Sequence, residues 1–157
     1  MSPLSKIFWM KHEQPAIYNQ TAKFADIKTY IFYQLFDKYV IDYSMASATG
    51  MFNLEQLDWD EKALKLLGIS RDQLPELVPT THILTGMKKR FAELMDIDEN
   101  TPVVVGASDG VLSNLGVNSY KKGEVAVTIG TSGAIRTVIN KPRTDYKGRI
   151  FCYVLDD

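Results

Sequence analysis

The residues best placed to do chemistry lie in the segment VVVGASDG, residues 103–110. Its three valines predict a buried strand, and small residues follow this strand up to Asp109 and Gly110. A carboxylate at the carboxyl end of a strand lies where α/β proteins bind ligands, in the crevice outside the strand ends. Asp109 is therefore a candidate general base. Aspartate is also a favoured helix N-cap residue, and this motif taken alone favours a cap.

A second candidate is the segment VAVTIGTSGAIRTVI, residues 125–139. Two apolar runs flank Gly130, Thr131, Ser132 and Gly133, which predicts a hairpin whose turn directs backbone N–H groups and hydroxyls toward phosphate oxygens. A Walker loop is excluded, because its lysine is missing and a strand follows instead of a helix. The alternative is an ordinary hairpin turn that needs glycine for positive φ, and the motif alone favours it.

The segments before residue 101 have mostly helical patterns. Asp26 is expected to cap a core-facing helix, whose apolar set is Ile27, Tyr30, Ile31, Leu35 and Phe36. Asp60 is expected to cap a second helix that Gly68 ends as a left-handed residue. A third helix over residues 87–95 is expected to bury Phe91, Leu94 and Met95.

The segments after residue 101 change to strand patterns. Residues 103–105 predict a strand buried on both faces, which favours a sheet covered by helices and an α/β fold class. A short helix is expected to follow and to end at Gly116, and residues 149–155 are expected to form another strand. Because the sequence ends directly after this strand with no closing helix, we expect it to be part of a larger protein.

Composition and charge limit the classes of function. The 157 residues are 45% hydrophobic and 24% charged, as in an ordinary globular protein. With 18 basic and 19 acidic residues, the net charge of −1 gives no reason to expect nucleic acid or a membrane as partner. No segment is typical of a membrane span or a secretion signal. The single cysteine, Cys152, excludes an internal disulfide, so a cytoplasmic location is expected, and the two histidines lack metal-ligand spacing.

Four segments in order resemble the FGGY family of carbohydrate kinases. They are PLSKIFWMK at 3–11, the stretch from IDYSMASATG to ELVP at 41–79, GASDG at 106–110 and TIGTSG at 128–133. The resemblance implies an actin-like ATPase (ribonuclease H-like) fold and covers only a middle portion of the family. Residues 1–118 would be the C-terminal part of the first domain, and residues 119–157 the beginning of the second.

The resemblance also implies ATP-dependent phosphorylation of a sugar or sugar acid. Asp109 would take the proton from a sugar hydroxyl as it attacks the γ-phosphate of ATP, and Gly110 would let the substrate approach the backbone. The turn from Gly130 through Thr131 and Ser132 to Gly133 would contact the β- and γ-phosphates. The Asp-Gly pair is most like the family's gluconate kinases, so conversion of gluconate to 6-phosphogluconate is expected. Xylulose or glycerol kinase activity, or a non-catalytic sugar-binding or structural module, are the alternatives.

Parts of the family pattern are missing from the sequence. The first phosphate hairpin, with the acidic residue that helps to hold Mg²⁺, is absent, and so is the adenine-binding segment. We therefore expect ATP and Mg²⁺ to serve the longer enzyme, with the metal ligands mostly outside this chain, and the chain alone to be inactive. Asp42 is expected to cap a short helix and to have only a structural role. Uncovered strand edges are expected to favour homo-oligomers.

Overall fold

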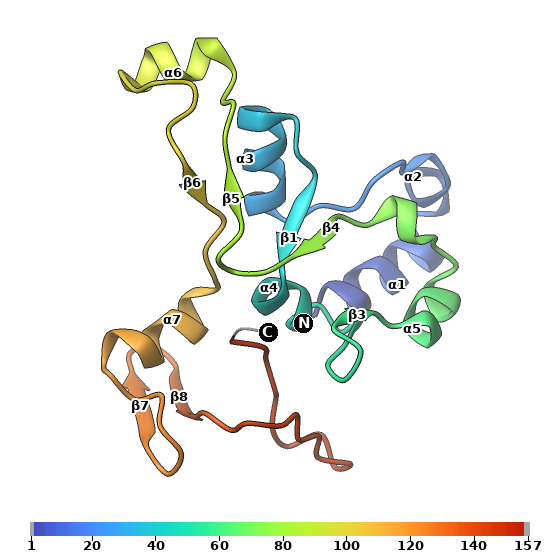
Figure 1. The fold of residues 1–157 in the computed structure, drawn as a ribbon. Helices are drawn as coiled ribbons and strands as arrows, with labels where there is room; N and C mark the ends of the chain where they lie inside the picture. Colours follow the sequence, from blue (N-terminus) through green and yellow to red (C-terminus); the bar gives the residue numbers. More distant parts are fainter. Residues whose placement is uncertain (1, 156–157) are drawn as a thin grey trace.

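The computed structural model describes residues 2–155, which form short helices and four two-stranded sheets (Figure 1). No helix within this range is long and apolar enough to cross a membrane. The first elements are α1 (Pro3–Glu13), α2 (Pro15–Gln20), α3 (Ile27–Phe36), β1 (Val40–Asp42), α4 (Tyr43–Ser47), β2 (Phe52–Asn53), β3 (Asp58–Trp59) and α5 (Glu61–Leu67). They are followed by the 3₁₀ turn η1 (Arg71–Gln73), β4 (Glu76–Val78), β5 (Ile83–Leu84), α6 (Lys89–Met95), β6 (Val103–Val104), α7 (Asp109–Gly116), β7 (Val125–Ile129) and β8 (Gly133–Thr137).

A parallel pair of strands, β1 and β4, lies at the centre of the fold. Successive residues of a strand point to opposite faces, so β1 directs Val40 to one side and Ile41 to the other. Val40 and Val78 belong to a second core, formed with Phe32, Phe36, Leu84, Met87, Ala92 and Val105. Ile41 belongs to a first core, formed with Ile7, Ala46, Met51, Trp59, Leu64, Leu67, Ile69 and Leu74. The pair is therefore a middle layer, with α3 on one side and α1 and α5 on the other (Figure 1).

Three predicted helix caps are confirmed. The side chains of Asp26, Asp42 and Asp60 each accept a hydrogen bond from the backbone N–H three residues later, at 2.7, 3.1 and 2.9 Å. Gly68 ends α5 in the left-handed conformation, with a φ of 77°. A cap of this kind contributes about 1 kcal/mol, so these residues fix where α3, α4 and α5 begin.

The predicted buried face of α3 is only partly correct. Phe36 is buried and Leu35 packs against the second core, as expected. Ile27, Tyr30 and Ile31 are exposed, with Ile27 at 74% of its full accessibility. The buried face also carries Phe32 and Thr29, and the Thr29 hydroxyl donates to the Val40 carbonyl oxygen at 2.9 Å. Apolar residues occur nearly all round this helix, so the contact with β1, rather than the apolar pattern, determines which face is buried.

The predicted inward residues of the third helix are partly wrong. Leu94 and Met95 are exposed, whereas Ala92 is buried and Phe91 packs against the second core. The helix, α6, spans only Lys89–Met95 and ends at a left-handed residue. Seven residues make about two turns, and Ala92 is the residue of this helix that is buried.

Two strand predictions also need correction. Val104 is 55% exposed, because β6 pairs only with β5 and its side chains alternate between core and solvent. Residues 149–155 form no strand. The Val154 N–H donates to the Ser47 hydroxyl at 3.1 Å, so its hydrogen bond goes to a side chain and not to a neighbouring strand.

Candidate active site

Asp109 is the first residue of α7, one position after the N-cap residue Ser108. Its carboxylate is exposed, and Oδ1 accepts a hydrogen bond from the adjacent Gly110 N–H at 2.6 Å. Within residues 2–155 no cation lies within ion-pairing distance of this carboxylate. One carboxylate oxygen is thus open to solvent, as a group that accepts a proton from a substrate requires.

The loop that presents Asp109 is held by backbone hydrogen bonds. The Val105 N–H donates to the His82 carbonyl oxygen, and the Gly106 N–H donates to the Thr80 carbonyl oxygen, both at 2.9 Å. Gly106 has a φ of 71°, a conformation in which other residues are strained. The chain therefore leaves the β5–β6 pair in a fixed direction and delivers Asp109 at the start of α7.

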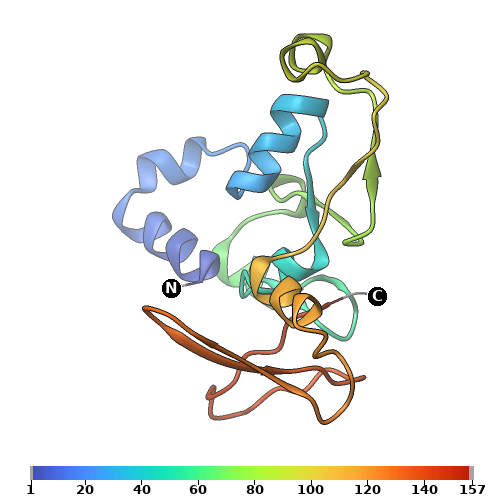
Figure 2. The ribbon, with the colours of Figure 1, turned by 90° about the vertical axis from the view of Figure 1, so that its left-hand side faces the viewer.

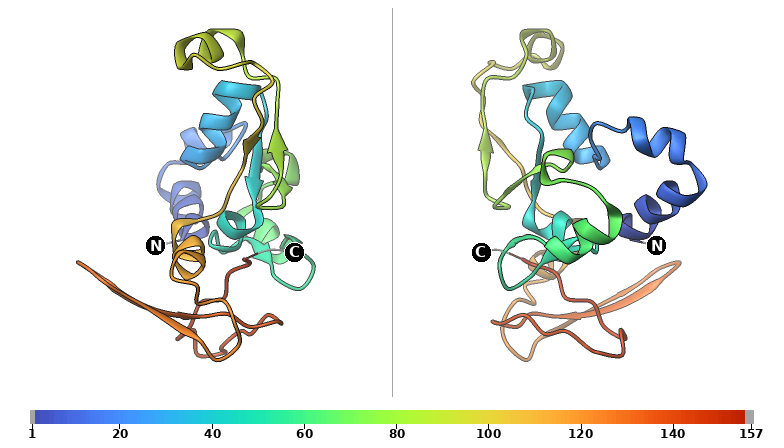
Figure 3. Two further views of the ribbon diagram at one scale, coloured as in Figure 1. Left: turned by 60° about the vertical axis from the view of Figure 1, so that its left-hand side comes forward. Right: turned by 90° about the vertical axis from the view of Figure 1, so that its right-hand side faces the viewer.

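The predicted hairpin around Gly130 is confirmed, and it is formed by β7 and β8. Ile129 faces Gly133 across the ladder, which leaves a three-residue turn, and this turn projects away from the body of the molecule (Figure 3). The Gly130 N–H donates to the Ser132 carbonyl oxygen at 3.0 Å, so this amide is used within the turn itself. Thr131 and Ser132 are exposed at the tip.

The two glycines of this turn are not required by its conformation. Neither Gly130 nor Gly133 has a φ in the left-handed region, so the positive φ of an ordinary turn does not explain them. A Cβ at Gly130 would lie 3.9 Å from the Ser132 carbonyl oxygen, and one at Gly133 would lie 3.7 Å from the Thr128 carbonyl oxygen, both ordinary contacts. Their lack of side chains instead leaves the backbone open to close approach by a ligand.

Arg136 is a further candidate site residue, which the sequence pattern did not indicate. It lies on β8, where Nη1 donates to the Thr128 hydroxyl at 3.3 Å. Its guanidinium also lies against the start of α7, since a Cβ built on Gly110 would be 3.4 Å from Nη2. Figure 2 shows α7 running alongside this hairpin. Arg136 thereby connects the hairpin to the segment that carries Asp109, a contact that strand alternation alone does not reveal.

The guanidinium of Arg136 has no ionic partner in the described part of the chain. No carboxylate of residues 2–155 lies within ion-pairing distance of it. Arginine stays charged at any physiological pH and its planar fork fits carboxylate and phosphate oxygens. The start of α7 and the hairpin together therefore offer a base, hydroxyl donors and a positive charge.

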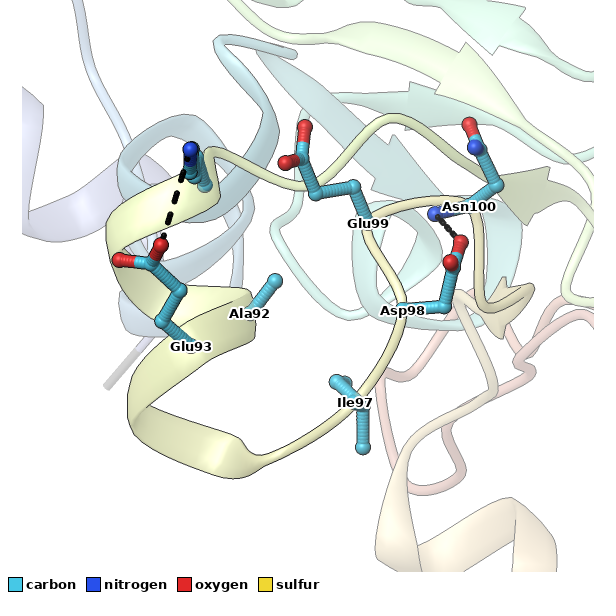
Figure 4. A pocket seen from close by; sticks show the side chains of 7 residues that line it. Ala92, Glu93, Ile97, Asp98, Glu99 and Asn100 are labelled. Atoms are coloured by element: carbon cyan, nitrogen blue, oxygen red, sulfur yellow. Dashed lines mark hydrogen bonds and ion pairs between the residues drawn. The ribbon is translucent and has the colours of Figure 1, made fainter.

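A shallow hollow beside α6 lies at the far end of the molecule from the hairpin (Figures 1 and 4). It is lined by Lys89, Ala92, Glu93, Ile97, Asp98, Glu99 and Asn100. Lys89 pairs with Glu93 at 3.8 Å, and the Asn100 N–H donates to Asp98 at 2.7 Å. None of the predicted site residues lines it, and the described residues hold no group of three side chains suited to a metal ion.

Residues 1–116 match the model of the N-terminal domain of the FGGY family of carbohydrate kinases. The chain belongs to this family. Its α/β class and its actin-like ATPase fold are confirmed by that match and by the similarity to solved members of the FGGY family.

The chain is similar to named members of the FGGY family. The chain is 63% identical to a gluconokinase of Bacillus subtilis (strain 168) over all 157 of its residues, which correspond to 31% of that protein. A crystal structure of gluconate kinase from Lactobacillus acidophilus matches 99% of the chain with a TM-score of 0.95 and 38% identity. A ligand-bound structure named as xylulose kinase from the same organism matches with the same values. In both structures the match covers 32% of the longer chain, so the present chain spans about a third of its relatives.

Proposed function

We propose that the chain is part of an ATP-dependent kinase that phosphorylates gluconate. The observation that carries this proposal is the 63% identity to the Bacillus subtilis gluconokinase along the whole chain. Because the chain spans 31% of that relative, further contacts to ATP are assigned to other parts of a longer polypeptide. We assign residues 1–118 to the first domain and residues 119–157 to the start of the second. The family match over residues 1–116 supports this division.

Asp109 is proposed as the general base. It accepts the proton of a substrate hydroxyl while that oxygen attacks the γ-phosphorus of ATP, and the bond from phosphorus to the bridging oxygen of ADP breaks. ADP leaves with that electron pair, and the proton remains on the carboxylate. The Gly110 N–H occupies one carboxylate oxygen, which directs the other toward the substrate. Proton transfer by a positioned base accelerates such a reaction by about 10²- to 10⁴-fold.

The turn between β7 and β8 is proposed to bind the phosphates of ATP. Thr131 and Ser132 supply exposed hydroxyls there, and Gly130 and Gly133 leave the backbone accessible. Hydroxyl and amide donors fit phosphate oxygens, whereas Mg²⁺ requires oxygen ligands such as carboxylates. Mg²⁺ would neutralise charge on the transferred phosphoryl group, and we assign its ligands mostly to other parts of the longer protein.

Arg136 is proposed to distinguish a sugar acid from a neutral sugar. Its guanidinium is beside Gly110 and lacks a carboxylate partner within residues 2–155, so a carboxylate of the substrate could pair with it. Xylulose, which is uncharged, is the second candidate substrate, and the similarity to the ligand-bound structure named as xylulose kinase favours it. Glycerol would also leave this charge unused.

The test is a comparison of gluconate and xylulose as substrates of the full-length kinase, with and without Arg136→Gln. We expect a higher kcat/KM for gluconate, and we expect Arg136→Gln to raise the KM for gluconate about tenfold or more. The KM for ATP should change less than about twofold. Arg143→Gln is the control, since Arg143 is exposed in the loop after β8. A higher kcat/KM for xylulose would refute gluconate as the substrate. A KM that rises for ATP alone would show that Arg136 binds a phosphate of ATP and not the carboxylate of gluconate.

The remaining partners and the location stay predictions of the proposed kinase. We assign it to the cytoplasm, where ATP is available and where a free thiol such as that of Cys152 remains reduced. Exposed apolar side chains on the hairpin, Val127, Ile129 and Ile135, are consistent with the predicted self-association of the chain. Static light scattering of the purified chain tests this.

A further inference from the structure

We propose that Lys28, Asp42 and Ser44 position Asp109 for proton transfer by holding the loop that carries it. This inference rests on the proposed function, because it concerns the base of that reaction. From the sequence, Asp42 and Ser44 are expected to have only structural roles, as a helix cap and as a small residue that permits close packing, and Lys28 has no assigned role. The contacts of these three side chains extend well beyond a cap.

Asp42 is the hub of these contacts. It ends β1, and its side chain has no exposed surface. Oδ1 accepts hydrogen bonds from the Ser44 hydroxyl and from the Met45 N–H, and Oδ2 lies 2.5 Å from Lys28 Nζ. A helix cap requires only the bond from Met45. The ion pair and the serine contact therefore call for a second role.

Two arms lead from Asp42 to the loop before α7. Lys28 Nζ donates to the Gly106 carbonyl oxygen at 3.0 Å. The Ser44 hydroxyl oxygen accepts a hydrogen bond from the Ser108 N–H at 2.8 Å. Gly106 and Ser108 precede Asp109 by three residues and one residue, so both arms act on the backbone directly before the base.

The charges of Lys28 and Asp42 determine which groups donate and which accept in the two hydrogen bonds to the loop. A buried carboxylate needs a cation to offset its lost hydration, and Lys28 supplies it. The ionised Asp42 carboxylate can only accept hydrogen bonds, so the Ser44 proton points toward it. The lone pairs of Ser44 are then free to accept the Ser108 N–H. The ion pair of Lys28 and Asp42 thus keeps the Ser44 hydroxyl oriented as an acceptor for the Ser108 N–H.

This geometry makes a prediction that a purely structural role does not. Displacement of a catalytic group by about 1 Å can lower the rate about 100-fold, even when the substitution is remote from the reacting atoms. Loss of the Ser44 hydroxyl should therefore lower kcat and leave the KM for ATP nearly unchanged. The loss should also disappear when Asp109 no longer acts as a base.

The experiment is a double-mutant cycle in the full-length kinase. Ser44→Ala is measured in the wild type and in an Asp109→Asn background, with kcat and both KM values determined. Ser47→Ala is the matched control, because Ser47 is also on α4 and its hydroxyl bonds to the Ser44 carbonyl oxygen and the Val154 N–H instead. We expect Ser44→Ala to lower kcat about tenfold or more in the wild type, and less than about twofold in the Asp109→Asn background.

Equal losses in both backgrounds, or no loss in the wild type, would overturn the positioning role. An Asp109→Asn enzyme that keeps most of its kcat would instead overturn the proposed base, so the two failures are distinguishable. If Ser44→Ala prevents folding, the double variant Lys28→Met/Asp42→Asn replaces it in the same cycle. That variant removes the hydrogen bond from Lys28 to the Gly106 carbonyl oxygen without leaving a buried charge. Equal losses of kcat in both backgrounds, or no loss in the wild type, would again overturn the positioning role.

A second measurement does not depend on activity. Amide hydrogen exchange of Ser108 in the 157-residue chain should accelerate about tenfold or more in Ser44→Ala and stay unchanged in Ser47→Ala. Unchanged exchange of Ser108 in Ser44→Ala would show that the Ser44 arm does not hold the loop in solution.

Discussion

Replacement of Asp109 by asparagine separates catalysis from folding, because the structure assigns the two effects different sizes. The side chain is exposed, and its one hydrogen bond, from the Gly110 N–H, can be accepted equally by the asparagine oxygen. Ser108, not Asp109, is the N-cap residue. Folding thus loses only a negative charge in the first turn of α7, which is worth about 0.3–1 kcal/mol.

The expected effect on catalysis is larger. An amide cannot take the substrate proton, so kcat should fall by about 10²- to 10⁴-fold. At about 1.36 kcal/mol per factor of ten, this corresponds to about 2.7–5.4 kcal/mol in the barrier. The change in kcat therefore exceeds what the change in stability can explain.

The assay is steady-state ADP release by the full-length kinase with gluconate, together with urea unfolding of the same preparations. Asp60→Asn is the matched control, since it removes a carboxylate from the start of another helix, α5, and leaves a good cap. We expect the control to keep its kcat. An Asp109→Asn enzyme with more than about a tenth of the wild-type kcat would refute the reasoning, because a general base contributes more than this.

Three further substitutions test the fold and the site. In urea unfolding, Leu67→Ala should lower the free energy of unfolding of the chain by about 2–5 kcal/mol, because Leu67 is fully buried in the first core. Leu66 is 53% exposed, so the control Leu66→Ala should change that free energy by less than about 0.5 kcal/mol. Arg71 lowers the pKa of Asp58 mainly by a hydrogen bond, so this pair stabilises the fold above about pH 4 and loses its effect as the pH falls further. Because both side chains are exposed, the pair should contribute less than about 1 kcal/mol to the free energy of unfolding. Urea midpoints measured from pH 6 to pH 2.5 should therefore depend less on pH in Arg71→Gln than in the wild type, and an equal dependence would contradict this. Gly110→Ala should stabilise α7 by up to about 1 kcal/mol yet lower kcat/KM, since its methyl group would lie against the Arg136 guanidinium that is proposed to bind the substrate carboxylate. An unchanged kcat/KM would refute a role for this glycine.

Local signals in the sequence predicted the helix ends correctly. Asp26, Asp42 and Asp60 cap helices through bonds to backbone groups three residues away, so each signal is contained within a few positions. The turn around Gly130 was located in the same way. Buried faces depend on a packing partner, and no local pattern identifies the partner. The face of α3 was therefore predicted correctly only at Leu35 and Phe36, since its apolar residues lie nearly all round the helix.

Residues of the candidate site could be predicted only where they lie within one short, recognisable segment of the sequence. Asp109 and the β7–β8 turn each follow a strand pattern, and both predictions concern short segments. The contacts of Lys28 with Gly106 and of Ser44 with Ser108 join residues that are 78 and 64 positions apart. Arg136 likewise contacts Gly110 only through the tertiary fold. Such contacts arise from chain topology, so one sequence without a structure does not reveal them.

The sharing of β1 and β4 between the two cores has a consequence for how the chain unfolds. Neighbouring residues Val40 and Ile41 belong to opposite cores, so neither core can open without breaking the β1–β4 ladder that supports the other. Both should melt as one cooperative unit. The β7–β8 hairpin contributes no described residue to either core and can open independently. The proposed nucleotide contacts thus lie on an element outside both cores. Asp109, in contrast, follows a loop that hydrogen bonds link through Lys28 and Ser44 to Asp42, at the end of the strand that both cores share.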